Sequence, residues 1–373
     1  MRKQFKVESL KFKVKKRLTL RAILFMLFTI HCSLFTASAD EITSRAALVM
    51  EASTGRILFA KNPTLKLPPA STTKLVTAMV VLDRAQLNDT VTISEKAAKV
   101  PTLKETRFKE GEAVSVETLL SAALIRSAND AAFALAEAVA SSEEKFVELM
   151  NKKVVAIGAS DTKFINTTGL PGSGQRTTAY DLAKIMRHAL KYPVIKEIIG
   201  TKETEISTNG GRTISLENTN RLLWSDEGAV GGKTGYTRAA RHCFTYAGQR
   251  NGETVIVALL GAPSRTVLWN EAERLEVKGF EVISSNEQPV VYFTRADYEK
   301  SLKSSPWRSG RGDKVQSSRV KRYSKDKAKI IKASSTKRLK TVRVKNKAKL
   351  SAKGNKKTKD ARIARGQNNG SKG

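Results

Sequence analysis

A serine and a lysine three residues apart are the side chains of this sequence with the clearest capacity for chemistry. Ser71 and Lys74 lie in the stretch 68–74, which directly precedes the apolar run 75–82. Two prolines disfavour a helix before Ser71, so we expect this serine in the first turn of a helix with Lys74 on the same face. A neutral lysine there could activate the serine as a nucleophile, and the helix dipole would stabilise developing negative charge. The alternative is an N-cap serine beside a solvated lysine.

Two further polar clusters fall where otherwise regular segments are interrupted. One separates two runs of helical spacing, and the other precedes a strand-like region. They are Ser127-Ala128-Asn129 and Lys233-Thr234-Gly235. Taken singly, each is more often a turn or an element end than a functional site. Their order after the serine and lysine, however, matches S-x-x-K, S-x-N and K-T-G, a combination that chance rarely produces.

Strand-like segments at both ends of the chain enclose a helical middle. Apolar runs typical of strands occur at 46–51, 56–61, 203–207, 212–216, 243–248, 255–260 and 290–293. Helical spacing occurs at 116–126, 131–140, 143–157, 178–190 and 266–279. This order predicts an α+β fold, in which an antiparallel sheet is flanked by helices and carries an all-helical insert.

In its three motifs the chain resembles the serine D-alanyl-D-alanine carboxypeptidases, the low-molecular-mass penicillin-binding proteins of the β-lactamase/transpeptidase-like superfamily. The flanking residues are similar to that group as well. They are Pro69-Ala70, Asn166 with Gly169-Leu170, and Tyr236-Thr237. The resemblance covers roughly residues 42–285 and implies the fold of that superfamily, with no cofactor and no metal.

The resemblance also implies a role for each motif residue. Ser71 is expected to attack the carbonyl between two D-alanines while Lys74 takes its proton, and water then hydrolyses the acyl-enzyme. Ser127 would be the third catalytic residue and would help to pass a proton to the leaving amine. The N–H groups of Ser71 and Tyr236 would form the oxyanion hole, and Gly235 would leave room for substrate along its strand. The expected substrate-binding residues are Asn129, Lys233, Thr234, Gly235 and Tyr236.

Lys233 has two expected effects in the implied site. With Thr234 it would bind the terminal carboxylate of the substrate, because a cation beside a hydroxyl suits a free α-carboxylate. Its charge would also favour a neutral Lys74, since a second positive charge nearby is unfavourable. The sequence departs from that of the group at one position after the K-T-G motif. Arg241 stands where the group usually has glycine, and it would strain a turn that needs a positive φ.

The implied partners are a peptidoglycan pentapeptide as substrate and β-lactam antibiotics as covalent inhibitors. A β-lactamase is one alternative, but that activity needs a carboxylate placed for deacylation, and residues 160–175 contain no convincing glutamate motif. A secreted penicillin-binding or scaffolding protein with weak turnover, acting through its basic tail, is the other. Release of D-alanine from a pentapeptide distinguishes the three.

The net charge of +32 belongs to the two ends of the 373-residue chain. Residues 1–39 hold nine Lys or Arg and one acid, residues 301–373 hold 25 and three, and the middle is nearly neutral. A basic stretch, a short apolar run and Ala37-Ser38-Ala39 predict a signal peptide at 1–39, with an uncleaved anchor as the alternative. We therefore expect a carboxypeptidase domain at 40–295 in the periplasm or cell envelope.

The segment 296–373 is expected to be a disordered basic tail. From about residue 301 lysine and arginine alternate with small polar residues, and such a composition cannot bury enough apolar surface to fold alone. Outside the cytoplasm a polycation would contact anionic lipid or envelope polymer. Nucleic acid has the matching charge but is disfavoured by export.

Cysteine and histidine usage excludes several kinds of site. Removal of the signal peptide would take Cys32 and leave Cys243 alone, so an internal disulfide is excluded. His188 and His242 are too few and too isolated for a zinc centre. We expect Cys243 to be a small buried hydrophobic residue and not a reactive thiol.

Overall fold

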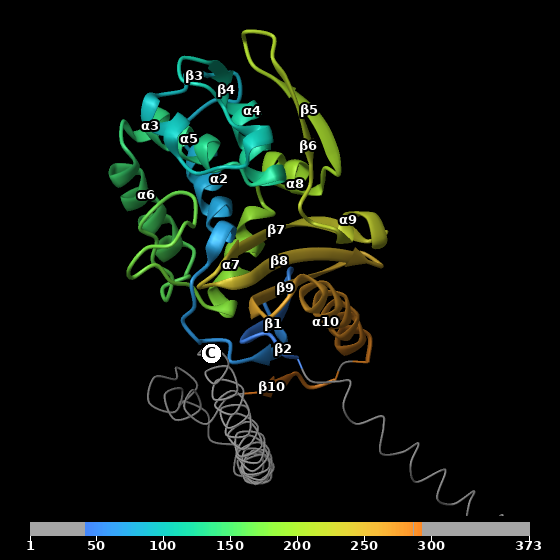
Figure 1. Ribbon diagram of the computed structural model, residues 1–373. Coiled ribbons are helices and arrows are strands. Elements are labelled where there is room, and N and C mark those ends of the chain that lie inside the picture. Colours follow the sequence, from blue (N-terminus) through green and yellow to red (C-terminus); the bar gives the residue numbers. More distant parts are fainter. Residues whose placement is uncertain (1–41, 286, 293–373) are drawn as a thin grey trace, which may run out of the picture. The chain divides into compact units, whose positions relative to one another are not determined.

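A six-stranded sheet forms the centre of the protein, as the computed structural model shows for residues 42–285 and 287–292 (Figure 1). The strand order is β10-β2-β1-β9-β8-β7. The strands are β1 (Ala46–Glu51), β2 (Ile57–Lys61), β7 (Ala229–Thr237), β8 (Arg241–Arg250), β9 (Glu253–Ala262) and β10 (Val290–Tyr292). The predicted signal peptide at 1–39 and the predicted tail at 296–373 lie outside the described residues.

The sheet has helices on both faces because its central strands are apolar on both sides. Along β9, Val255 and Val257 pack into one core with Leu268 of α10, whereas Ile256 and Ala258 pack into a second core on the opposite face. Successive side chains of a strand point to opposite faces, so a continuous apolar run is buried twice. The α+β prediction is confirmed. The sheet is not wholly antiparallel, however, because β10 pairs parallel with β2.

Most of the helices lie above the β7 edge of the sheet in Figure 1. Helix α7 packs on one face of the sheet and α10 on the other. The helices are α2 (Lys74–Leu82), α3 (Glu95–Lys99), α4 (Val116–Ser121), α5 (Asn129–Ala140), α6 (Glu143–Ala156), α7 (Ala179–Ala189), α8 (Pro193–Gly200), α9 (Leu222–Ser225) and α10 (Arg265–Ser285). Short turns of other helix types are η2 (Ala70–Thr73), η3 (Lys104–Thr106) and η4 (Ala122–Arg126). Two small ribbons pair β3 (Thr90–Thr92) with β4 (Ala113–Ser115) and β5 (Glu203–Ser207) with β6 (Thr213–Glu217).

Most predicted elements form within one or two residues of their expected ends. Thr178 caps α7, since its side chain accepts a hydrogen bond from the Asp181 N–H. The sequence analysis predicted no helix between 190 and 203, so it missed α8. Pro193 is the first residue of α8, a position where its missing N–H is no loss. The β3–β4 ribbon and α9 were also missed.

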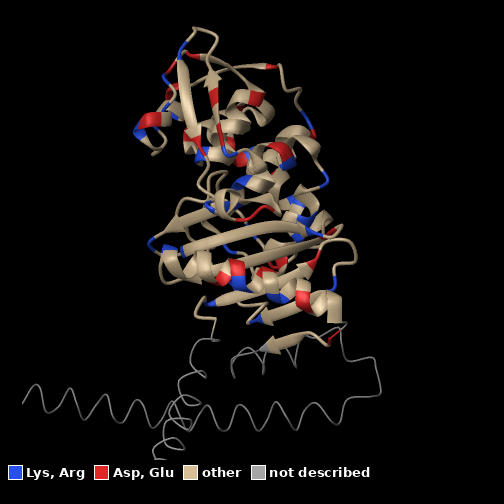
Figure 2. Cartoon of the chain, turned by 90° about the vertical axis from the view of Figure 1, so that its right-hand side faces the viewer, with Lys and Arg blue, Asp and Glu red and all other residues tan. Residues whose placement is uncertain are grey.

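Basic and acidic side chains are interspersed over the described part of the chain (Figure 2). This agrees with the nearly neutral middle of the sequence. Within residues 42–285 and 287–292 no helix has the length and apolar character needed to span a bilayer.

Two neighbouring carboxyl groups, Glu276 and the partly exposed Asp226, join α10 to the segment that leads into β7. Asp226 accepts hydrogen bonds from the Tyr246 hydroxyl and from the Gly228 N–H, the latter at 2.9 Å. Burial opposes ionisation of Asp226, but these hydrogen bonds outweigh it and lower its pKa. Glu276 is 1% exposed, and burial together with the Asp226 charge raises its pKa to about 8. Glu276 therefore keeps its proton at neutral pH, although Arg250 lies 3.4 Å away.

We expect Glu276 to make the protein less stable as the pH rises. A carboxyl whose pKa is raised by folding binds more protons in the folded state, so the free energy of unfolding falls between the ordinary pKa of 4.5 and about 8. Glu276→Gln should flatten this slope, whereas Glu281→Gln on the exposed side of α10 should not. Urea unfolding from pH 5 to 9 measures the effect. Equal slopes for Glu276→Gln and the unmodified protein would contradict the assignment.

Candidate active site

Ser71 lies in the tight turn η2, which continues directly into α2. Its Oγ is 3.1 Å from Nζ of Lys74. Lys74 is 1% exposed, so the alternative of a solvated lysine is wrong. The predicted position at a helix start is confirmed, with the difference that the first turn is a 3-10 turn.

The Lys74 amine has three neighbours that define its hydrogen bonds. Besides Ser71, Nζ lies 2.6 Å from Asn129 Oδ1 and 2.8 Å from the Thr168 carbonyl oxygen. Burial first, and then the nearby Lys233, hold the pKa of Lys74 well below 10.5, with Asp130 opposing. A neutral amine has two hydrogens and one lone pair. If the amide and the carbonyl accept the two hydrogens, the lone pair is free to face the Ser71 hydroxyl.

The loop 166–170 places the Thr168 carbonyl beside Lys74. Asn166 Oδ1 accepts the Gly169 N–H at 2.8 Å, and Asn166 Nδ2 donates to the Leu170 carbonyl at 2.9 Å. Gly169 has φ +83°, and a Cβ there would lie 1.9 Å from the carbonyl oxygen of Ala70. The loop therefore lies directly against the turn that holds Ser71. The sequence pointed to Asn166 and Gly169 but missed Thr168, since every residue has a carbonyl.

Ser127 ends the π-helical turn η4 in a left-handed conformation with φ 69°. Its Oγ is buried, and no described residue pairs with it. Asn129 begins α5, and its Nδ2 donates to the Pro101 carbonyl at 2.6 Å. Asp130 was not predicted: it is buried, and its carboxylate accepts the Phe108 N–H at 2.8 Å. The S-x-N motif is thus fixed by contacts with a segment some 20 to 30 residues earlier.

The K-T-G motif lies on the edge strand β7. Lys233 is fully buried, and burial lowers its pKa to about 7. The Thr234 hydroxyl lies 2.6 Å from the hydroxyl of Thr219. The sequence analysis did not predict a role for Thr219. Its N–H also donates to the Ile125 carbonyl at 3.2 Å, in the turn before Ser127. Thr219 therefore contacts both the K-T-G strand and the turn that leads to S-x-N.

Glycine is required at position 235 for a structural reason, in addition to the room for substrate that the sequence suggested. A Cβ at this position would lie 2.7 Å from the Ser71 backbone nitrogen and 3.0 Å from Ala70 Cβ. The missing side chain thus lets β7 approach the nucleophile turn, and not simply the substrate. Tyr236 is 59% exposed, and its ring lies 4.5 Å from that of His242.

Arg241 has the strained backbone that its replacement of glycine predicted. It opens β8 opposite Thr237, with φ +60°. A side chain in the left-handed region costs about 1–2 kcal/mol relative to ordinary backbone. Nearby Cys243 is buried, and burial raises the pKa of its thiol to about 12. The prediction that Cys243 is a small buried residue is confirmed.

A serine and a buried lysine, with polar side chains from α5 and β7 around them, define an α+β protein of the serine acyl-transfer class. No metal-binding group of three His, Cys, Asp or Glu side chains occurs in the part of the chain that the structure describes.

Comparisons with known proteins agree with this class. The sequence model of the D-alanyl-D-alanine carboxypeptidase family matches residues 33–264. The carboxypeptidase DacF of Bacillus subtilis is 35% identical over 260 residues, 67% of each chain. The carboxypeptidase DacC of Escherichia coli is 36% identical over 66% of this chain and 63% of its own length. A point mutant of the Streptomyces K15 DD-transpeptidase is a similar solved structure, with a TM-score of 0.62, 30% identity, and coverage of 65% of this chain and 99% of that one. The chain belongs to the D-alanyl-D-alanine carboxypeptidase family of serine peptidases.

Proposed function

We propose that this protein is an exported D,D-carboxypeptidase that removes the terminal D-alanine from peptidoglycan pentapeptide stems through an acyl-enzyme at Ser71. The observation that carries the proposal is the buried Lys74 amine, 3.1 Å from the Ser71 hydroxyl and within 2.8 Å of two other acceptors. Membership of the carboxypeptidase family supports the substrate class. It does not favour the β-lactamase or scaffolding alternatives.

Acylation begins with proton transfer from Ser71 to Lys74. Ser71 Oγ attacks the carbonyl carbon of the peptide bond between the two D-alanines, and the Lys74 lone pair takes the hydroxyl proton. The N–H groups of Ser71 and Tyr236 stabilise the resulting oxyanion. The close approach of Gly235 to the Ser71 nitrogen supports this pairing of a strand N–H with a turn N–H.

The leaving D-alanine needs a proton on its amine. We assign this transfer to Ser127, and the assignment is supported by its buried Oγ, which has no partner among the described residues. Asn129 binds the peptide backbone while its Oδ1 holds the Lys74 amine. A water molecule then attacks the ester and regenerates Ser71.

The terminal carboxylate of the substrate binds to Lys233 and Thr234. In the free protein burial lowers the pKa of Lys233 to about 7, so part of the population is uncharged at neutral pH. A bound carboxylate stabilises the charged form of Lys233. The negative charge of the carboxylate offsets the charge that Lys233 gains, so binding adds no net positive charge beside Lys74.

The proposed location is the periplasm or cell envelope, on the basis of the predicted signal peptide and of the envelope substrate. Penicillins are expected to acylate Ser71 as substrate mimics. Contact of residues 301–373 with anionic polymer or lipid stays a prediction from charge alone.

Release of D-alanine from a soluble pentapeptide tests the proposal. We expect turnover by the unmodified protein and none by Ser71→Ala, with hydrolysis of penicillin much slower than peptide cleavage. Fast penicillin hydrolysis would instead identify a β-lactamase, and stable acylation without D-alanine release would identify a binding protein.

A further inference from the structure

The geometry points to the Arg212–Glu112 ion pair as a device that holds residues 101–112 against Asn129 and so positions the Lys74 amine. Arg212 and Glu112 are positioning residues and do not touch the substrate. This inference rests on the proposed function of Lys74 and Asn129.

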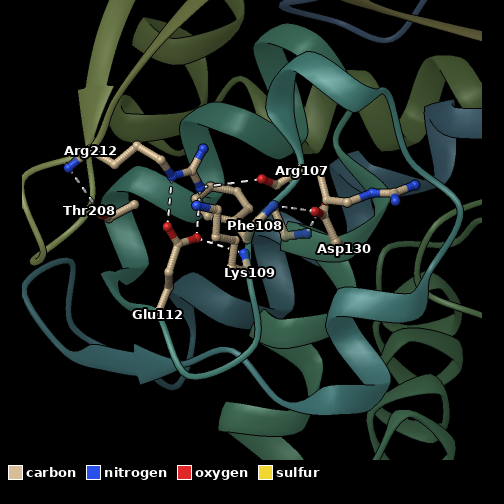
Figure 3. Close-up of polar contacts among 8 residues, drawn as sticks. Arg107, Phe108, Lys109, Glu112, Asp130, Thr208 and Arg212 are labelled. Atoms are coloured by element: carbon tan, nitrogen blue, oxygen red, sulfur yellow. Dashed lines mark hydrogen bonds and ion pairs between the residues drawn. The ribbon is translucent and has the colours of Figure 1, made fainter.

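The ion pair has the paired geometry of a guanidinium on a carboxylate (Figure 3). Arg212 Nε donates to Glu112 Oε1 and Nη2 donates to Oε2, both at 2.7 Å. Nη2 also donates to the Arg107 carbonyl at 3.3 Å. The side chains are 29% and 16% exposed, so the pair is shielded more than an ordinary surface pair. Burial opposes ionisation of Glu112, but the hydrogen bond from Arg212 outweighs it and lowers its pKa, so Glu112 is charged at neutral pH.

The segment 101–112 has few apolar contacts of its own to hold it. Among its residues Thr106 and Phe108 alone are buried, and most others are exposed. The Phe108 ring lies 5.8 Å from the Arg212 guanidinium, and the Lys109 N–H donates to Glu112 Oε2 at 2.7 Å. A segment with little buried apolar surface depends on such polar contacts for its place.

The other end of the same segment holds the S-x-N motif. The Pro101 carbonyl accepts from Asn129 Nδ2 at 2.6 Å, and Thr102 Oγ1 accepts from the Asn129 N–H at 3.1 Å. Between these contacts and the ion pair, the Phe108 N–H donates to Asp130 (Figure 3). Asn129 Oδ1 in turn contacts Lys74 Nζ at 2.6 Å. A shift of the segment therefore moves the amide that orients the base.

Arg212 comes from the turn of the β5–β6 hairpin, an element that contributes no residue to the site itself. Figure 1 shows the hairpin rising beside α4 toward the end of the protein where β3 and β4 lie. Its turn is fixed there by a backbone hydrogen bond of 2.9 Å from the Asn209 N–H to the Ala113 carbonyl. The hairpin can thus act as a fixed support for residues 101–112.

The test measures the rate of acylation by a fluorescent penicillin as a function of pH. We expect Arg212→Met to lower the second-order rate constant by about tenfold to a hundredfold, the range for misplacement by about 1 Å. Glu112→Gln should lower it less, and the double variant no more than Arg212→Met alone, because the two residues act as one unit. The rising limb of the plot of acylation rate against pH should move to higher pH. A loosened segment 101–112 would admit water to Lys74, and burial is the main cause of the low pKa of Lys74.

A matched control is available in the Asp83–Lys153 ion pair. It has an N···O distance of 2.9 Å, and its side chains are 29% and 16% exposed, like those of the proposed pair. Asp83→Asn should lower the melting temperature without moving the pH profile. Arg212→Lys, which keeps the charge but not the two parallel hydrogen bonds, serves if Arg212→Met does not fold.

The outcomes separate this inference from the proposed function. Unmodified protein that is not acylated at Ser71 would overturn both. Unmodified protein that is acylated, together with Arg212 and Glu112 variants whose rate and pH profile are unchanged or match those of Asp83→Asn, would overturn the positioning role alone.

Discussion

Replacing Lys74 by methionine is expected to lower the rate of Ser71 acylation by about a hundredfold or more, the usual contribution of a general base. Methionine keeps most of the side-chain volume but cannot take the serine proton. The variant should also lose the rising limb of the pH profile, because that limb reports the loss of the Lys74 proton. Stopped-flow acylation with a chromogenic penicillin measures both effects.

Lys233→Ala tests the effect of the Lys233 charge on the pKa of Lys74. Removing the Lys233 charge should raise the pKa of Lys74, because Lys233 is the second cause of its lowering after burial. The rising limb of acylation should therefore move to higher pH. A limb that stays in place would contradict the assigned coupling, and a rising limb that persists in Lys74→Met would contradict the role of Lys74 as the base.

Replacing Gly169 by alanine is expected to destabilise the protein by about 3 kcal/mol and to slow acylation. The added Cβ would lie 1.9 Å from the Ala70 carbonyl oxygen, and the residue has φ +83°. Overpacking costs about 1–3 kcal/mol and the left-handed backbone about 1–2 more. The clash should push the loop away from η2 and withdraw the Thr168 carbonyl from Lys74. Urea unfolding and the acylation rate measure the two consequences.

Gly174, five residues further along the same chain, provides the control for that substitution. It has φ +86°, but a Cβ there would meet nothing within 4 Å. Gly174→Ala should therefore show the backbone strain alone, about 1 kcal/mol, with an unchanged acylation rate. Equal acylation rates for Gly169→Ala and Gly174→Ala would show that the loop does not support Lys74.

The sequence predicted the parts of this site that depend on residue type and local spacing. Ser71 and Lys74 could be placed on one helical turn because their separation and the preceding prolines act locally. The α+β class followed from the order of strand-like and helical segments. Arg241 was recognised as strained because it replaces glycine in an otherwise familiar turn, and its φ of +60° bears this out.

The contacts that complete the site could not be predicted, because they join distant segments through atoms without a sequence signal. The Thr168 carbonyl is a backbone group, and its place depends on the approach of Gly169 to Ala70. Thr219 is an ordinary threonine in sequence, and it gains significance through its contact with Thr234. In the sequence Asp130 is typical of the first turn of a helix, but in the structure it is buried and accepts a hydrogen bond from the Phe108 N–H.

The measurement that tests the central claim most directly is the location of the covalent adduct formed with a labelled penicillin. The protein would be treated with the label, digested, and analysed by peptide mass spectrometry, with Lys74→Met treated in parallel. The structure predicts a single adduct on Ser71 in the unmodified protein and a strongly reduced yield in Lys74→Met over the same time. An adduct on another residue, or a folded protein that forms none, would contradict the account.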